Sequence, residues 1–230
     1  MKKNVVVLTG AGISAESGIS TFRDAGGLWE GYDWREVASP EGWRKDPELV
    51  LRFYNERRQL LHSVEPNDGH YALVELEKYY NITIITQNID DLHERAGSKN
   101  IVHLHGELKK MRSSYNPSLV YDISGDIKIG DKCEKGSQLR PHIVWFGEAV
   151  PMMDPASQLM KAADYVLIVG TSMQVYPAAS LIDFAPFRTP CWYIDKDPAK
   201  VPSYINIVPE PATTGVPKVV KTLIDKAKNH

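Results

Sequence analysis

Cysteine is scarce in this chain, which has two in 230 residues, Cys133 and Cys191. Cys133 lies in a polar stretch, whereas Cys191 opens an apolar run that is typical of a buried strand. Two cysteines in such different settings do not suggest the framework of disulfides that stabilises small secreted proteins. They also fall short of the four nitrogen or sulfur ligands of a closed structural zinc site. The sequence therefore argues against a disulfide scaffold.

Long apolar runs and an excess of one charge are missing as well. No stretch approaches the roughly 20 apolar residues that a membrane helix needs, and the first apolar run begins at Val5, which leaves no room for a signal peptide. The chain has 27 Lys and Arg against 29 Asp and Glu, a balance that does not favour nucleic acid or membrane surfaces. We expect a cytoplasmic protein that binds neither. We also expect a monomer.

A glycine-rich turn follows the first apolar run, which covers residues 5–8. Gly10, Gly12 and Ala15 match the G-x-G-x-x-G/A spacing, in which glycines let the backbone approach a pyrophosphate at the start of a helix. The pattern predicts a strand, a phosphate loop and a helix. At this point it is open whether the glycines serve a nucleotide or only permit a turn with positive φ.

An ordinary dinucleotide fold carries an acidic residue for the ribose about 20 residues after these glycines, and this chain has none in such a context. Residues 20–29 are instead polar and rich in glycine, and they include Arg23, which predicts a mobile loop over the cofactor. The missing acid argues against an ordinary dehydrogenase and for a different use of the same turn.

The alternation of apolar runs with helical patterns predicts an α/β fold, a Rossmann-like doubly wound parallel sheet with a smaller inserted module. The expected strands after the first are residues 82–86, 101–106, 142–146, 165–169, 191–195 and 204–208. The expected helices cover 34–64, with a cap at Asp46 and Pro47, then 70–79, 92–95, 155–163, 177–184 and 217–227. We expect one domain over 1–230, with its core at about 1–29, 66–108 and 141–230 and its small module at about 30–65 and 109–140. Within that module, residues 119–122 and 126–129 are expected to pair.

Polar side chains follow two of the expected parallel strands. Gln87, Asn88 and Asp90 come directly after one strand, and His105 ends the next beside a glycine. Ligands bind at the carboxyl edge of open α/β sheets, so these groups are well placed for a cofactor. Asn88 or Asp90 could instead cap the helix that follows.

His105 and His103 could form half of a metal site, but no third or fourth ligand lies at a useful spacing, so we expect no metal.

Several longer motifs resemble the sirtuin family. They are G-A-G-I-S-A-E-S-G-I-x-x-F-R at 10–23, T-Q-N-I-D-x-L-H at 86–93, H-G-E-L at 105–108, W-F-G-E at 145–148 and G-T-S at 170–172. The matches run in family order from residue 5 to about 195. The resemblance implies NAD-dependent removal of acyl groups (succinyl, malonyl or acetyl) from lysines of proteins or peptides, giving nicotinamide and O-acyl-ADP-ribose. It makes His105 the catalytic base, with Asn88 and Asp90 beside it.

The resemblance also assigns residues to each ligand. It implies NAD contacts from Gly10, Ala11, Gly12, Ile13, Ala15, Phe22, Arg23, Trp29, Gln87, Asn88, Ile89, Asp90, His105, Gly170, Thr171, Ser172, Asp195 and Val216. The substrate peptide would pair with the edge formed by Val144, Trp145, Phe146, Gly147 and Glu148. Asp195 stands where many sirtuins have asparagine, and its carboxylate would repel a 2′-phosphate, which favours NAD over NADP. Alternatively, Asp195 is only a solvated residue at the end of a strand.

Two features set this chain apart within the resemblance. Many sirtuins carry two C-x-x-C pairs that bind zinc, and residues 109–140 offer only Cys133, so we expect no zinc. Ala25, Tyr54 and Arg57 match the branch that prefers malonyl- and succinyl-lysine, in which the tyrosine and arginine bind the distal carboxylate. The alternative is a surface pair on the helix, with Arg57 bound to Glu56. For the whole chain, an NAD or ADP-ribose sensor without turnover and an ADP-ribosyltransferase are the rival functions.

Overall fold

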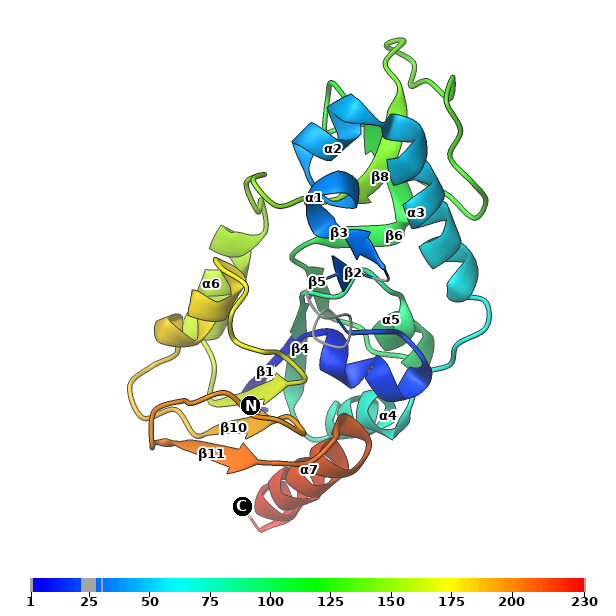
Figure 1. Cartoon of the computed structure of the whole chain (residues 1–230). Helices are drawn as coiled ribbons and strands as arrows, with labels where there is room; N and C mark the ends of the chain where they lie inside the picture. The colour runs from blue at the N-terminus through cyan, green and yellow to red at the C-terminus, as the bar shows by residue number, and fades with distance from the viewer. Residues whose placement is uncertain (1, 22–27, 30, 230) are drawn as a thin grey trace.

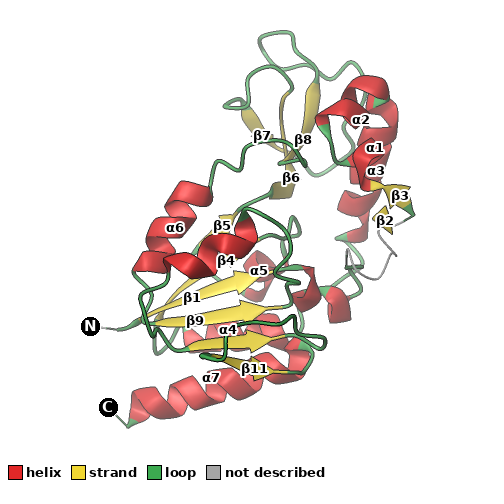
Figure 2. Ribbon diagram, turned by 60° about the vertical axis from the view of Figure 1, so that its left-hand side comes forward, coloured by secondary structure: helices red, strands yellow, loops and turns green. Residues whose placement is uncertain are grey.

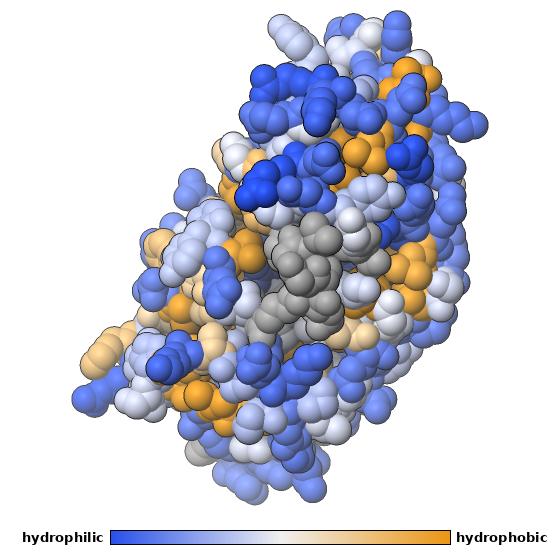
Figure 3. Space-filling model, in the orientation of Figure 1, coloured by the Kyte–Doolittle hydropathy of each residue, from blue (hydrophilic) through white to orange (hydrophobic). Residues whose placement is uncertain are grey.

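The structure, a computed structural model, describes residues 2–21, 28–29 and 31–229. It has two parts (Figure 1): a large parallel sheet with helices on both faces, and a smaller part built around a three-stranded antiparallel sheet. Within these described residues, none of the helices is long and apolar enough to cross a membrane. The face shown in Figure 3 is mostly hydrophilic, with apolar side chains in scattered groups.

The large sheet has the strand order β11-β10-β9-β1-β4-β5, and every pair is parallel. Its strands are β1 (Asn4–Thr9), β4 (Asn81–Thr86), β5 (Ile101–His103), β9 (Tyr165–Val169), β10 (Cys191–Ile194) and β11 (Ile205–Val208). From β1 the chain adds β4 and then β5 on one side, and later adds β9, β10 and β11 on the other side. The point between β1 and β9 where the direction of addition changes creates the crevice in which such sheets bind ligands. The predicted Rossmann-like fold class is therefore confirmed.

Alternating side chains of β1 explain how helices cover both faces of the sheet. Val5 and Val7 pack toward α4 (Asp68–Leu76) and α7 (Ala212–Lys228), whereas Val6 and Leu8 pack toward α6 (Met153–Lys161) and η3 (Ala178–Phe184). Figure 2 shows α6 on one side of the sheet and α4 and α7 on the other. Each such side chain is fully or almost fully buried, and burial of one stabilises the fold by about 1.5–3 kcal/mol.

The smaller part joins two segments that lie far apart in the sequence. Its sheet has the order β7-β6-β8, formed by β6 (Gly106–Ser113), β7 (Val120–Asp122) and β8 (Leu139–Ile143). Against it pack α1 (Trp34–Val37), α2 (Pro40–Lys45) and α3 (Pro47–Leu60), and the hairpin β2 (Leu28–Trp29) and β3 (Tyr32–Asp33) precedes them. Asp46 caps α3 as predicted, because its carboxylate accepts a hydrogen bond from Leu49 N at 2.9 Å.

Four predicted elements are wrong in detail. The glycine turn is followed by two short 3₁₀ turns, η1 (Ala11–Ile13) and η2 (Ala15–Ser17), and not by a long helix, because Gly18 takes a left-handed conformation and ends the second turn. Residues 126–129 form no strand, since β7 pairs with β6. The strand expected at 142–146 is β8, which pairs with β6 in the small sheet and not in the core sheet. Helix α7 begins at Ala212, five residues before the predicted start at Pro217.

Hydrogen bonds from α3 and a small apolar cluster hold the chain between β7 and β8. The Arg58 guanidinium donates to Leu108 O at 2.6 Å and to Asn55 Oδ1 at 2.8 Å, and Asn55 in turn bonds both the N–H and the carbonyl of Ile127. Cys133 is buried with Ile127, Leu51 and Leu139. Arg58 is itself 2% exposed, so its guanidinium lies inside the small part. Protein oxygens there accept hydrogen bonds that water would accept from an exposed arginine.

Candidate active site

A cavity of about 610 Å³ lies where the carboxyl ends of β1, β4, β9 and β10 face the small part. This volume is within the range of roughly 300–1,000 Å³ that is common for ligand sites. Most of the predicted site residues line it: Gly10, Ala11, Gly12, Ala15, Trp29, Tyr54, Arg57, Gln87, Asn88, Ile89, Asp90, His105, Val144, Trp145, Phe146, Gly147, Glu148, Gly170, Thr171, Ser172 and Asp195. The fold thus brings groups from both parts of the molecule to one cavity.

The glycines at the end of β1 are needed for close packing of two backbones. Gly12 N donates to Gly170 O at 2.8 Å, and a Cβ on Gly12 would lie 2.5 Å from Gly170 Cα. A Cβ on Gly10 would lie 2.8 Å from Gly170 O. Neither glycine has a positive φ, so the interpretation that they only permit a turn is wrong; Gly170 does adopt φ 60°. Gly10, Gly12 and Gly170 carry no side chains, and this leaves room for a phosphate at the turn.

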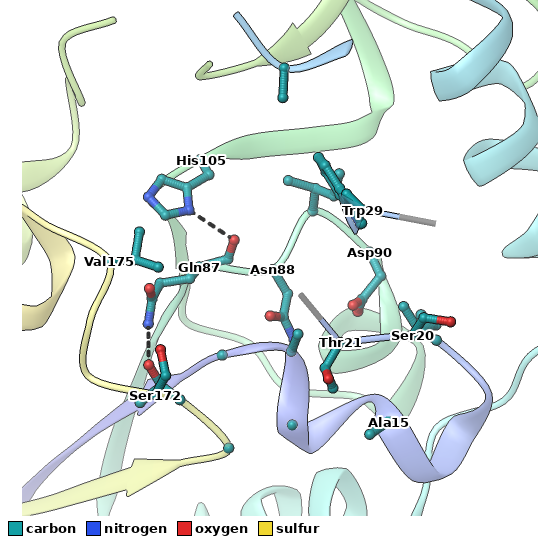
Figure 4. A pocket seen from close by; sticks show the side chains of 18 of the residues that line it. Ala15, Ser20, Thr21, Trp29, Gln87, Asn88, Asp90, His105, Ser172 and Val175 are labelled. Atoms are coloured by element: carbon teal, nitrogen blue, oxygen red, sulfur yellow. Dashed lines mark hydrogen bonds between the residues drawn. The ribbon is translucent and has the colours of Figure 1, made fainter. Parts of the chain in front are cut away.

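His105 occupies the connection between β5 and β6, where the chain passes from the large sheet to the small one. Its Nδ1 lies 3.1 Å from the Gln87 carbonyl oxygen (Figure 4). A carbonyl can only accept, so Nδ1 carries the proton in the neutral ring and Nε2 is left as the base. Burial lowers the pKa of His105, an effect that the Gln87 carbonyl partly opposes. A neutral imidazole at pH 7 can take up a proton.

Asn88 and Asp90 meet at Ser14, a buried residue that sequence reasoning did not single out. Asn88 Nδ2 donates to Ser14 Oγ at 3.2 Å, and Ser14 Oγ donates to Asp90 Oδ2 at 3.1 Å. Asp90 also accepts from Leu92 N at 3.1 Å and so bonds the first N–H of the following helix, although the N-cap position itself is Asp91 and not Asp90. Burial raises the pKa of Asp90 to about 6. The position of Ser14, two residues after the second glycine, was the available signal.

Polar groups also follow β9 and β10 at the far end of the cavity. Gln87 Nε2 donates to Thr171 Oγ1 at 3.1 Å, one of the two bonds drawn in Figure 4. Asp195 is 7% exposed, and its carboxylate accepts from Asp197 N at 2.9 Å. The interpretation of Asp195 as a solvated strand end is therefore wrong, because the residue is buried at the wall of the cavity. Such an arrangement fits the ribose and phosphates of a dinucleotide.

Two residues one turn apart on α3, Tyr54 and Arg57, bring polar groups from the small part to the cavity. Tyr54 is fully buried, and its hydroxyl oxygen accepts from Trp145 Nε1 at 3.1 Å. The Arg57 guanidinium carbon lies 4.3 Å from the centre of the Phe53 ring, and Nη1 lies 3.9 Å from Glu56 Oε2. The predicted alternative contact with Glu56 thus exists, but at long range, while Arg57 still lines the cavity.

Residues 144–148, which follow β8, form an edge that lines the cavity. Val144 N donates to His105 O at 2.9 Å and Phe146 N donates to Ala38 O at 3.0 Å, so this edge is tied to both parts of the molecule. The Glu148 carboxylate accepts from Trp145 N at 2.8 Å and from the guanidinium groups of Arg140 and Arg112. With these partners Glu148 holds the edge in place and still lines the cavity, so its expected contact with a peptide stays a prediction.

Residues 10–177 match the Sir2 family. The chain belongs to this family. An NAD-dependent protein deacylase of Helicobacter pylori is 55% identical over 227 residues, which cover 98% of this chain and 99% of that protein. A Sir2 homologue solved in complex with NAD is 39% identical and superimposes with a TM-score of 0.85, covering 98% of this chain and 91% of its own. Sir2Af2, solved with a myristoylated histone peptide, is 30% identical with a TM-score of 0.73, covering 100% and 94%. The resemblance to sirtuins is therefore confirmed.

Two residues that the sirtuin resemblance assigned to NAD lie outside the cavity lining. Ile13 and Val216 are both 0% exposed, and both pack in the core between the sheet and α7. The resemblance assigned Val216 to NAD as a residue that opens the last helix. Because α7 already starts at Ala212, Val216 lies inside the helix, and Pro211 and Ala212 line the cavity. Phe22, Arg23 and Ala25 lie outside the described residues.

His103, the other histidine of this Sir2 chain's H-x-H motif, has a separate partner. Its Nε2 lies 2.6 Å from Glu94 Oε1 and its Nδ1 lies 3.3 Å from Asn88 O. Burial opposes protonation, but the Glu94 carboxylate prevails and raises the pKa of His103. Glu107 lies close to this pair and is bonded to Lys110 at 2.9 Å. His103 is therefore part of an ion-pair network, as its predicted structural role implied.

Proposed function

We propose that this Sir2-family enzyme removes acyl groups from protein lysines in an NAD-dependent reaction, and that it prefers acyl groups ending in a carboxylate, malonyl and succinyl, over acetyl. One observation carries the preference: Tyr54 and Arg57, from one face of α3, line the same cavity as His105. Residues three apart on a helix are neighbours, so a phenol and a guanidinium reach one region of the cavity. The division into a core and an inserted module would place NAD and the acyl-lysine between them.

The cavity fits a dinucleotide by its shape and donor groups. Close packing of Gly10 and Gly12 against Gly170 keeps side chains out of the turn that would face the phosphates. Asp195 would accept ribose hydroxyls, and Asn88, Asp90 and Ser14 would hold the nicotinamide end. When bound, NAD supplies the ribose carbon that takes up the acyl oxygen and the hydroxyl that then receives the acyl group, with loss of nicotinamide.

His105 would perform the proton transfer. Its Nδ1 is held by the Gln87 carbonyl at 3.1 Å, which fixes the ring and leaves Nε2 to accept the proton of a ribose hydroxyl. Asn88 and Asp90 are positioned by Ser14 and by the first turn of α5 (Leu92–Ala96). The edge at 144–147 would pair with the substrate backbone, a mode that tolerates many sequences because main-chain bonds supply the affinity.

Arginine makes the acyl preference physically reasonable. A hydrogen bond between a guanidinium and a carboxylate is worth about 1.5–3 kcal/mol. This corresponds to a discrimination of roughly tenfold to hundredfold between succinyl and acetyl. We further propose that no zinc is required, because Cys133 is the only cysteine of the small part and it packs in an apolar cluster.

A panel of peptides with one sequence and an acetyl-, malonyl- or succinyl-lysine tests the proposal. Nicotinamide release is measured for each with and without NAD. We expect release only when NAD and an acylated peptide are both present, with the highest kcat/KM for malonyl or succinyl. Transfer of ADP-ribose to protein without deacylation would favour a transferase, and NAD binding without turnover would favour a sensor.

A further inference from the structure

The hydrogen bond between Trp145 and Tyr54 has a fixed direction. An indole N–H can only donate, so in the 3.1 Å contact Trp145 Nε1 is the donor and the Tyr54 hydroxyl oxygen is the acceptor. The hydroxyl proton of Tyr54 is not used in this bond. Among the described residues, no carbonyl, carboxylate or other acceptor takes a hydrogen bond from it. Tyr54 is nevertheless fully buried at the wall of the cavity.

A buried donor without an acceptor is costly, and a ligand that supplies the acceptor recovers that cost. Burial also raises the pKa of Tyr54 well above its ordinary value, so the hydroxyl keeps its proton and remains a donor at any physiological pH. The carboxylate at the end of a succinyl or malonyl group is such an acceptor. The methyl group of an acetyl-lysine is not.

We infer that Trp145 determines acyl specificity by positioning Tyr54. The indole N–H of Trp145 donates to the lone pair of the Tyr54 hydroxyl oxygen, and the hydroxyl proton is thereby directed to the carboxylate of the acyl group. This inference rests on the proposed preference for acidic acyl groups. It assigns a role to the Trp145 side chain that is separate from peptide pairing, which uses the backbone of the same segment.

The surroundings of Trp145 are built to keep the indole in one orientation. The Arg140 guanidinium carbon lies 3.2 Å from the centre of the Trp145 ring. The same guanidinium donates to Glu148 Oε1 at 2.7 Å and to Ile143 O at 2.8 Å. Glu148 Oε2 also accepts from Trp145 N at 2.8 Å, so one ion pair fixes both the backbone and the ring. Trp145 is 2% exposed and cannot rotate without breaking this packing.

A double-mutant cycle tests the inference. Kinetic constants are measured on succinyl- and acetyl-lysine peptides for the wild type, Trp145→Phe, Tyr54→Phe and the double variant. Tyr54→Phe should lower the succinyl-to-acetyl ratio of kcat/KM by about tenfold or more, the value of a hydrogen bond to a charged group. Trp145→Phe keeps an aromatic ring for Arg140 and should lower the same ratio by roughly threefold to tenfold, mainly through a higher KM for the succinyl peptide. In the Tyr54→Phe background it should change the ratio no further, because its only route is through the hydroxyl.

The matched control is Trp43→Phe. Trp43 packs against Trp145 with ring centres 5.7 Å apart and does not line the cavity. It should leave the succinyl-to-acetyl ratio within about twofold, the size expected from a change in packing alone. Equal losses on both peptides in Trp145→Phe, or losses that multiply in the double variant, would overturn the inference while leaving the acyl preference standing. An unchanged ratio in Tyr54→Phe would overturn the acyl preference itself and this inference with it.

A spectroscopic measurement covers the case in which Trp145→Phe does not fold. The indole N–H resonance of Trp145 is compared in the wild type and in Tyr54→Phe, without substrate. Loss of the hydrogen bond should move the proton resonance upfield in Tyr54→Phe. A resonance that stays in place would show that the bond is absent in solution and would contradict the inference.

Discussion

His105 Nδ1 lies 3.1 Å from the backbone carbonyl oxygen of Gln87, the residue that directly follows strand β4. This contact settles which nitrogen of the ring carries the proton and which can act as a base. It also joins two loops that leave neighbouring strands, so the base is held by the backbone of the fold. The position of the His105 ring therefore depends on the parallel pairing of β4 with β5, because Gln87 follows β4 and His105 follows β5.

The pH dependence of turnover should report this histidine. Burial lowers the pKa of His105, so the base loses its function only below the ordinary value of about 6.5 for histidine. We expect kcat/KM to stay constant from pH 8 to about 6.5 and to fall at lower pH. Asp90, with a pKa raised to about 6, titrates nearby. The acid limb should therefore be measured in Asp90→Asn as well, and a midpoint at or above 6.5 in both proteins would contradict the assignment.

Arg57→Met should separate the two acyl substrates. We expect a loss of roughly tenfold to hundredfold in kcat/KM on succinyl-lysine and a much smaller loss on acetyl-lysine, which offers the guanidinium nothing to bind. Arg52, exposed on the same helix, gives the matched control Arg52→Met, which should leave both values near those of the wild type. Equal losses on both peptides in Arg57→Met would mean that the arginine supports the fold or the cofactor loop.

Zinc should be absent from the purified protein at stoichiometric levels. Cys133 is buried against Leu51, Ile127 and Leu139, and Cys191 lies in β10 of the other sheet. Elemental analysis should find far less than one zinc per chain, and activity and Tm should be unchanged in chelator. Cys133→Ala should keep its activity and lose about 1 kcal/mol of stability through the lost packing. A full equivalent of zinc that disappears in Cys133→Ala would refute this expectation.

Stability should fall between about pH 6.5 and pH 4 because of a buried histidine. His70 is 0% exposed, and burial lowers its pKa to about 4, so the unfolded chain takes up a proton before the folded one does. From pH 7 to 5 this single group should lower the free energy of unfolding by about 2 kcal/mol. The neutral His70→Gln retains a side chain that can reach the Asn67 N–H, which His70 Nδ1 now accepts at 3.2 Å.

Denaturant midpoints at pH 7 and pH 5 measure the effect. The difference between the two midpoints should shrink in His70→Gln and should persist in the control His62→Gln, whose residue is exposed. An unchanged difference in His70→Gln would assign the acid sensitivity to other groups. His93, in ring contact with His70 at 4.9 Å and with its pKa lowered by burial, is the first of these.

Local patterns in the sequence predicted the elements that local forces determine. The alternation in β1 places Val5 and Val7 on one face, and Asp46 with Pro47 starts α3 where expected. The resemblance to sirtuins brought most site residues to the right cavity. One failure depends on a distant partner, because β8 pairs with β6 in the small sheet. Others are errors of helix boundaries: Gly18 ends η2, and α7 starts earlier than Pro217 suggested, which buries Val216.

The bond from Trp145 to Tyr54 could not be predicted for the same reason. The two residues are 91 positions apart, and neither has a local pattern that identifies the other. The linkage of Arg58 and Asn55 to the loop at 125–127 is equally invisible in the sequence. Such contacts depend on how two parts of the chain pack, and periodicity carries no information about that.

The most direct test of the account is the mass balance of a single reaction, followed by mass spectrometry in the wild type and in His105→Ala. With NAD and a succinyl-lysine peptide, the wild type should form free lysine peptide, nicotinamide and O-succinyl-ADP-ribose in equal amounts. His105→Ala should bind NAD and form almost none of them. Free succinate released without consumption of NAD, or unchanged turnover in His105→Ala, would contradict the account.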